Sequence, residues 1–212
     1  MGWKRRTGRA EYRCMPNALA RIATPADIDA IVSTFTSAFF HDPVWGPAFP
    51  DEGRRGVQAA VMWRVYVTSA LRYPWTLVTS NAEAAAVWIP PEGIELTSEE
   101  ASGLEGRLAQ VTTADAARAI MSVGEQFDAA HPREPFFYLT ILGTHADHRG
   151  KGLGMALLAD GLARIDELGV PAYLESTNPD NLKRYQSVGF AVRDEITIAT
   201  GQVVTTMWRP AA

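Results

Sequence analysis

The stretch from Phe136 to Gly154 (FFYLTILGTHADHRGKGLG) limits what this chain can fold into more than any other part of it. It begins with a short apolar run, rich in aromatic and β-branched residues, that is typical of a strand buried on both faces. A polar turn and three alternating glycines with two cations follow, and a helical pattern then starts. Glycines let backbone N–H groups approach a ligand, and a helix N-terminus attracts anions. The stretch therefore predicts a pyrophosphate-binding loop between a strand and a helix.

The spacing of the glycines excludes two common nucleotide-binding loops. A P-loop needs a glycine five positions before Gly150 and a Ser or Thr after Lys151, and neither is present. The dinucleotide fingerprint GxGxxG needs a glycine where Met155 stands. The pattern that does fit is Arg/Gln-x-x-Gly-x-Gly/Ala, which is met by Arg149, Gly152 and Gly154.

Length and charge narrow the classes of function. With 212 residues, 47% of them hydrophobic, the chain can bury a sizeable core as one domain, which we expect over residues 15–212. The net charge of −4 combines +4 on the first thirteen residues with −8 on the rest. Residues 1–14 are therefore predicted to be a basic, disordered leader. The acidic remainder argues against nucleic acid as a partner and mildly favours a cationic substrate.

Cysteine and hydropathy patterns indicate a cytoplasmic protein that is not bound to membranes. Cys14 is the only cysteine, so an intrachain disulfide or a cysteine metal cluster is excluded and a reducing compartment is favoured. No apolar run reaches the ~20 residues of a membrane span. The turn His145–His148 has poor geometry for zinc, so no metal is expected. The sequence leaves the oligomeric state open, a homodimer included.

The periodicity of apolar residues and the turn signals predict a mixed α/β (α+β) fold. Helices are predicted over residues 24–39, 54–73, 97–109, 114–129, 153–168 and 179–188. Strands are predicted over residues 17–23, 75–80, 83–89, 136–142, 172–176, 190–199 and 202–208. The segment 44–53 reads as a loop rich in Pro, Gly and aromatic residues. The strands that flank helix 153–168 are expected to pair in parallel.

A second informative stretch runs from Tyr173 to Phe190 (YLESTNPDNLKRYQSVGF). Its Leu-Glu-Ser, its asparagines and its Tyr before Gly-Phe resemble the later motif of the GCN5-related N-acetyltransferases (GNAT). The pattern around Arg149 resembles the acetyl-CoA loop of the same family, and the resemblance covers nearly everything except the leader. A closer likeness, carried by AAAVWIPPE and the two long motifs, is to puromycin N-acetyltransferase and its relatives.

The resemblance implies a GNAT fold, a mixed central sheet of about seven strands flanked by helices. It also implies an acetyltransferase that moves an acetyl group from acetyl-CoA to a primary amine of a small molecule, by direct attack in a ternary complex. The backbone at the end of the strand would pair with the pantetheine arm, the glycine loop would hold the pyrophosphate, and two asparagines would contact pantetheine. The implied cofactor-binding residues are Leu142, Gly143, Thr144, Arg149, Gly150, Lys151, Gly152, Leu153, Gly154, Met155, Asn178, Asn181 and Tyr185.

Two residues are candidates for catalysis. Tyr185 can donate a proton to the leaving thiolate, because its phenol is protonated at neutral pH; packing on the sheet is the alternative. Glu175 is the first choice for the base that takes a proton from the ammonium group, because a charge inside a strand needs a specific partner. A structural salt bridge is the alternative for Glu175, and capping of the short helix is the alternative for Asn181.

The acceptor pocket is expected in the first half of the chain. Its predicted residues are Phe39, His41, Asp42, Trp45 and Trp88. Trp63, Tyr66 and Trp75 are predicted to contribute more to the core than to this pocket. Two other functions fit the same motifs, namely a non-catalytic acetyl-CoA sensor and a protein N-acetyltransferase, which would need a long open groove.

Overall fold

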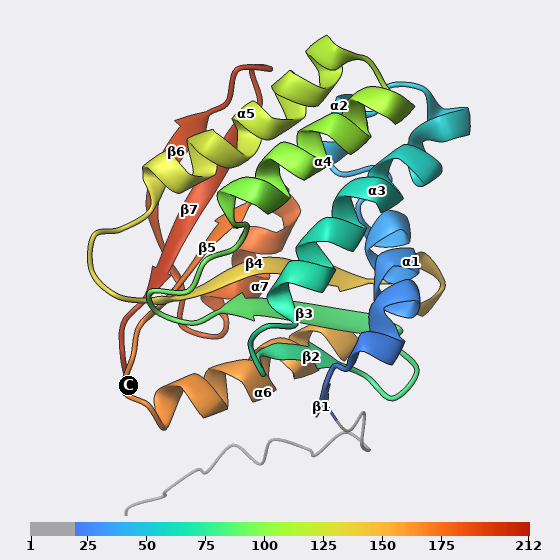
Figure 1. The fold of residues 1–212 in the computed structure, drawn as a ribbon. Coiled ribbons are helices and arrows are strands. Elements are labelled where there is room, and N and C mark those ends of the chain that lie inside the picture. The colour runs from blue at the N-terminus through green and yellow to red at the C-terminus, as the bar shows by residue number, and fades with distance from the viewer. Residues whose placement is uncertain (1–19) are drawn as a thin grey trace, which may run out of the picture.

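The computed structural model describes residues 20–212, so the predicted leader over residues 1–14 lies outside it. Seven strands form one mixed sheet in the order β1-β2-β3-β4-β5-β7-β6, which confirms the predicted fold class (Figure 1). The strands are β1 (Arg21–Ile22), β2 (Thr76–Val78), β3 (Ala84–Ile89), β4 (Phe137–Thr144), β5 (Ala172–Ser176), β6 (Ala191–Thr197) and β7 (Val203–Arg209).

The helices lie close to their predicted positions, and local capping explains several of their ends. Asp51 caps α3 by accepting a hydrogen bond from the Gly53 N–H, and Thr97 with Glu100 forms the predicted capping box of α4. The helices are α1 (Ile28–Ala38), α2 (Trp45–Ala48), α3 (Glu52–Ala70), α4 (Ser98–Val111), α5 (Ala114–Ala130), α6 (Leu153–Asp166) and α7 (Leu182–Gln186).

Two local predictions are wrong. The segment 44–53 is not all loop, because its residues 45–48 form α2. This helix starts where the Asp42 carboxylate accepts hydrogen bonds from the Val44 and Trp45 N–H groups. The helix predicted over 153–168 ends at Asp166, so Leu168 lies beyond its last turn and is 56% exposed.

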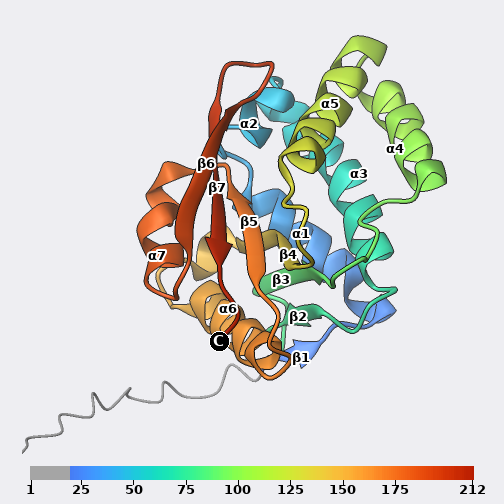
Figure 2. The same ribbon diagram turned by 90° about the vertical axis from the view of Figure 1, so that its left-hand side faces the viewer.

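Helices cover the two faces of the sheet unequally (Figures 1 and 2). On one face α6, with the short α7 beside it, packs on the strands and buries a cluster that includes Leu157, Leu162 and Ile165. On the other face α1, α3, α4 and α5 bury the larger cluster around Phe35 and Trp63. The sheet therefore separates two hydrophobic cores. A ligand can reach the middle of the sheet only where two neighbouring strands move apart.

Such a separation occurs between β4 and β5. These strands are parallel, as predicted for the pair that flanks α6, but they pair only at Phe137–Ala172 and Tyr138–Tyr173. Beyond this point β5 turns toward β7, with which it pairs as far as Ser176, while β4 continues to Thr144 (Figure 2). The two strands thus enclose a wedge, and the β5-facing edge of β4 over residues 139–144 has no strand partner.

A β-bulge changes the direction of side chains on β4 at the wedge. Opposite β3, Val87 pairs with Ile141 and Trp88 with Leu139, so Thr140 is an extra residue without a partner. In a regular strand, residues three positions apart lie on opposite faces of the sheet. Because of the bulge, Tyr138 and Ile141 instead contribute to the same core. The bulge turns the Thr140 side chain into the wedge, next to Glu95 of the β3–α4 loop.

No helix within residues 20–212 has both the length and the apolar character that crossing a bilayer requires.

Candidate active site

An outer cleft of about 540 Å³ opens where the end of β4, the N-terminus of α6 and the segment before α7 meet. It contains every predicted cofactor-binding residue except Lys151. Three predicted acceptor-pocket residues, Phe39, His41 and Asp42, also line it. The structure thus brings together two motifs that are separated by more than twenty residues in the sequence.

The floor of the outer cleft is backbone. Gly150 and Gly152 both have φ of 76°, a left-handed conformation that L side chains rarely adopt. A Cβ on either residue would meet no protein atom within 4 Å, so the space above them is free for a ligand. Gly154 is different, because a Cβ there would lie 2.9 Å from Thr144 Oγ1; this glycine lets α6 pack tightly against β4.

The N-terminus of α6 faces this cleft without a side-chain cap. Its N-cap residue is Gly152, and the first turn holds no acidic residue. The N–H groups of Leu153, Gly154 and Met155 precede the first intrahelical bond, which runs from the Ala156 N–H to the Gly152 carbonyl. Such free N–H groups and the helix dipole suit a phosphate group, so these residues fit the pyrophosphate of acetyl-CoA.

The two cations of the loop behave differently. Arg149 lines the cleft, and its Nη2 donates a hydrogen bond of 2.8 Å to the Ala38 carbonyl at the end of α1. Lys151 is exposed and does not line the cleft; its Nζ lies 3.3 Å from His148 Nδ1. The Lys151 side chain is thus not part of the cleft wall, and the place of Lys151 in the cofactor site stays a prediction that concerns its backbone N–H.

An inner pocket of about 70 Å³ lies deeper in the wedge and adjoins the outer cleft. The residues that line both cavities are Phe39, Asp42, Leu142, Asn181 and Tyr185. The walls of this pocket come from the α1–α2 segment, α2, α3, α5, α7, β4, β5 and the β3–α4 loop. By volume the pocket holds on the order of five water molecules.

Tyr185 stands at the junction of the two cavities. Burial, followed by the negative charge of Asp42, raises the pKa of its phenol to about 12. The hydroxyl is therefore protonated at neutral pH and can act as a donor. Asp42 lies beside the junction and accepts a hydrogen bond of 2.7 Å from Thr177 Oγ1, in addition to those that start α2.

Glu175 lines the inner pocket from β5, as predicted, but it already has a partner. Its Oε1 lies 3.3 Å from His131 Nε2, and its side chain is only 2% exposed. Burial lowers the pKa of His131, but the nearby carboxylate of Glu175 and the charges of Asp128 and Glu95 outweigh burial and raise it. Glu175 and His131 thus form a close pair of side chains at the back of the inner pocket.

Sequence reasoning missed Glu95, a second carboxylate in the inner pocket. It lies on the loop between β3 and α4, and its Oε1 accepts a short hydrogen bond from Thr140 Oγ1. Burial and then the charges of Asp128 and Glu175, opposed by the Thr140 hydrogen bond and by His131, raise the pKa of Glu95 to about 7. In the sequence, nothing distinguishes Glu95 from its neighbours Glu92, Glu99 and Glu100.

The tryptophans predicted near the acceptor divide between pocket and core. Trp45 and Trp63 line the inner pocket with their rings 5.7 Å apart, and Tyr66 lines it as well. Trp88 lines neither cavity: it is fully buried under α6, where a Cβ on Gly161 would lie 2.6 Å from its Nε1. Its assignment to the substrate pocket is therefore wrong, because its side chain points to the opposite face of the sheet.

Both asparagines line the outer cleft, but the capping role that was the alternative for Asn181 is filled by Asn178. Asn178 lines the outer cleft and caps the turn before α7, since its Oδ1 accepts a 2.9 Å hydrogen bond from the Asp180 N–H. Asn181 makes no capping bond; its Oδ1 instead accepts a hydrogen bond of 2.8 Å from Arg184. Within residues 20–212 no cluster of His, Cys, Asp and Glu side chains could hold a metal ion.

Comparison with known proteins agrees with this geometry. Residues 116–190 match the acetyltransferase (GNAT) family, which covers the glycine loop and Tyr185. Two curated relatives are mycothiol acetyltransferases, from Thermomonospora curvata (29% identical over 119 residues) and Propionibacterium freudenreichii subsp. shermanii (26% over 170 residues). The alignments cover 55% and 78% of this chain but only 33% and 40% of those relatives, so the chain spans less than half of their length. The predicted closer likeness to puromycin N-acetyltransferases therefore stays a prediction.

A solved structure shares the fold along nearly the whole chain. It is the "histone acetyltransferase HPA2 and related acetyltransferase" of Corynebacterium glutamicum, which is 25% identical with a TM-score of 0.67. The match covers 91% of this chain and 96% of that one. The family match contains the glycine loop, and the fold of that solved structure extends over almost all of the described residues, so the chain is similar to GNAT acetyltransferases both in this loop and in its fold.

Proposed function

We propose that this protein transfers an acetyl group from acetyl-CoA to a primary amine of a small molecule, in one complex that holds both substrates. The observation that carries this proposal is the position of Tyr185, which lines both the outer cleft and the inner pocket. The outer cleft fits the donor, and the inner pocket offers the acceptor a place beside the donor's reactive end. Direct attack needs such an arrangement, because the nucleophile and the carbonyl must be held together.

Acetyl-CoA would be bound mainly by backbone. Residues 149–155 present N–H groups to the pyrophosphate, and the unpaired edge of β4 at residues 142–144 can pair with the pantetheine arm as another strand would. Asn178 and Asn181 lie on the opposite side of the cleft. When bound, acetyl-CoA supplies a thioester as the acyl donor. A backbone N–H of residues 142–144 is the candidate to stabilise the developing oxyanion.

Tyr185 would donate a proton to the leaving sulfur. Its raised pKa keeps the hydroxyl protonated over the neutral range, and its place between the cavities puts it where the two substrates meet.

The inner pocket suits a compact ammonium group. Its walls carry aromatic rings, including Trp45, Trp63 and Phe127, whose faces attract cations. Two carboxyl groups, Glu95 and Glu175, add negative charge. The small volume of the pocket supports a small-molecule acceptor over a protein substrate, which would need an open groove.

The experiment is a thiol-release assay with acetyl-CoA and a panel of amines graded by size, from short alkylamines and arylalkylamines to aminoglycosides and peptides. We expect release of free thiol with compact amines. Acetyl-CoA binding by calorimetry, without thiol release for any amine, would instead favour the sensor function. Turnover with peptides alone would favour a protein N-acetyltransferase.

A further inference from the structure

We propose that Glu95, rather than the Glu175 predicted from the sequence, accepts the proton from the acceptor's ammonium group; this assignment rests on the proposed function. Both carboxyl groups line the inner pocket, so the choice between them depends on which one an incoming amine can reach. Three properties favour Glu95: its accessibility, its hydrogen bonding and the contacts that fix its loop.

Glu175 is poorly accessible to an incoming amine. Its side chain is 2% exposed, and its fully buried Oε1 lies 3.3 Å from His131 Nε2 without a hydrogen bond between them. Taking a proton at Glu175 would also neutralise the carboxylate beside His131, which is costly because it leaves an uncompensated buried charge.

Glu95 has a free oxygen. Thr140 donates to its Oε1, whereas its Oε2 takes part in no hydrogen bond within residues 20–212. Glu95 itself lines the inner pocket. An ammonium group in the pocket can therefore donate to Oε2 while Thr140 fixes the other oxygen.

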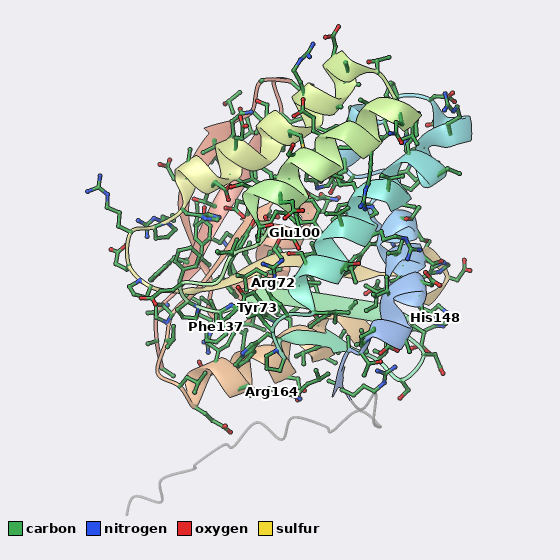
Figure 3. The ribbon with its side chains drawn as sticks, viewed as in Figure 1. Arg72, Tyr73, Glu100, Phe137, His148 and Arg164 are labelled. Atoms are coloured by element: carbon green, nitrogen blue, oxygen red, sulfur yellow. The ribbon has the colours of Figure 1, made fainter. Side chains whose placement is uncertain are left out.

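The loop that carries Glu95 is fixed by hydrogen bonds to α3 and its C-terminal turn. Glu92 has φ of 61°, which is strained for a residue with a side chain, and strain of this kind persists where the surroundings fix the backbone. Two residues of α3 and its C-terminal turn supply that fixation: the Tyr73 hydroxyl accepts a 2.8 Å hydrogen bond from the Ile94 N–H, and Ser69 donates to the Glu95 carbonyl. Arg72 completes the support by pairing with Glu100 at the start of α4 (Figure 3).

The proton balance of this assignment is complete. The ammonium gives one proton to Glu95 Oε2, and the neutral nitrogen then forms the N–C bond. The nitrogen loses its second proton as the C–S bond breaks. Tyr185 donates its proton to the sulfur and regains one from the nitrogen, while Glu95 passes its proton to water. One proton is released to solvent for each amide formed.

The groups that face Glu95 set the pH range of this step. They are contributed by α3, by α5 and its C-terminal end, by β4 and by β5, and they comprise Tyr66, Asp128, His131, Tyr138 and Glu175. Two acidic neighbours disfavour a charged Glu95 and one basic neighbour favours it. The net result is a carboxyl group that titrates near neutrality, where a general base works best.

The test compares three variants, Glu95→Gln, Glu175→Gln and Glu92→Gln, in the thiol-release assay with one compact amine from pH 6 to pH 9.5. Glu92 is exposed on the same loop and lines neither cavity, so its variant is the matched control. We expect Glu95→Gln to lower kcat by about 10² to 10⁴-fold at pH 7. The deficit should shrink as pH rises, because more of the amine then arrives already neutral.

Several outcomes would overturn the assignment. One is a Glu95→Gln enzyme within about two-fold of wild type at every pH; another is a pH-dependent deficit confined to Glu175→Gln. A deficit of Glu95→Gln that is the same at all pH values would indicate a structural role. Should this variant unfold, Glu95→Asp keeps the carboxylate and is expected to retain the wild-type pH profile at reduced kcat. Wild-type enzyme without turnover on any amine would instead refute the proposed function itself, and the base with it.

Discussion

The outer cleft and the inner pocket of this protein share Tyr185, but the first is lined mainly by backbone groups and the second by side chains. The outer cleft is formed largely by backbone: left-handed glycines, the free N–H groups of α6 and the open edge of β4. Its charged side chains, such as Arg149, are exposed. The inner pocket is formed by side chains from distant elements, and its carboxyl groups are enclosed by protein.

This difference determines how much each region lowers the stability of the folded protein. Free N–H groups at a helix end remain in contact with water, so the outer cleft costs the fold little. An enclosed carboxylate is unfavourable in its charged form unless it is paired, and Glu95 has no cationic partner as close as the one that Glu175 has in His131. The inner pocket should therefore be the region where function lowers the stability of the fold.

The largest effect expected from this comparison is on stability. The pKa of Glu95 is raised to about 7 from an ordinary value of 4.5, so the folded state favours the protonated form. The stabilisation from this group is complete below about pH 4.5 and is lost as pH rises through about 7. Replacing Glu95 with Gln, which stays neutral, should stabilise the protein relative to wild type by about 1–3 kcal/mol more at pH 8.5 than at pH 4.5.

Urea unfolding at the two pH values measures this difference. Glu92→Gln, on the exposed part of the same loop, should show no such change between the two conditions. A Glu95→Gln variant whose stability relative to wild type is the same at both pH values would mean that the inner pocket does not disfavour charge.

The second effect is on catalysis at the junction. Tyr185→Phe removes only a hydroxyl, so kcat should fall by about 10²-fold or more, since the thiolate then leaves unprotonated. Affinity for acetyl-CoA, measured by calorimetry, should stay within about two-fold of wild type. An equal loss in both quantities would show that the hydroxyl belongs to donor binding, and unchanged turnover would remove its role as the acid.

The same comparison explains which parts of the molecule could be predicted from sequence. The elements of the outer cleft are contiguous, because the strand, the turn, the glycines and the helix follow one another between Phe136 and Asp166. Local patterns therefore predicted this region, and the predicted mixed sheet, the parallel pair around α6 and the α4 capping box are confirmed. Local patterns did not predict that the Lys151 side chain lies outside the cleft wall, because the orientation of one side chain on a loop is not a local pattern.

The inner pocket could not be predicted in this way. The hydrogen bond that holds Glu95 joins it to Thr140, 45 positions away in the sequence. This bond depends on a β-bulge that cannot be predicted from the residue types at that place. Trp88 was misassigned for a related reason: Trp45 and Trp88 are equally aromatic, and only the pleat of β3 decides that Trp88 faces α6. Side-chain sites of this kind depend on register and loop path rather than on composition.

The third prediction tests whether the outer cleft depends on backbone conformation. Gly152→Val places a β-branched residue at φ of 76°, a strain of about 1–2 kcal/mol, and fills the space open to the pyrophosphate. The dissociation constant for acetyl-CoA should rise about ten-fold or more. Gly201→Val is the matched control, because Gly201 has φ of 89° and equally open surroundings but lies in the β6–β7 turn. It should lose similar stability and keep its affinity for acetyl-CoA.

The smallest effect expected separates the two cations of the loop. Arg149 lines the outer cleft, whereas Lys151 points away from it, although the two are equally prominent in the sequence motif. Arg149→Gln should weaken acetyl-CoA binding by about two- to five-fold, and the loss should shrink at high salt because the cation is exposed to solvent. Lys151→Gln should leave affinity unchanged at both salt concentrations. Equal losses for the two variants would mean that the loop attracts the donor by its total charge, and the outer cleft would then depend on side chains as the inner pocket does.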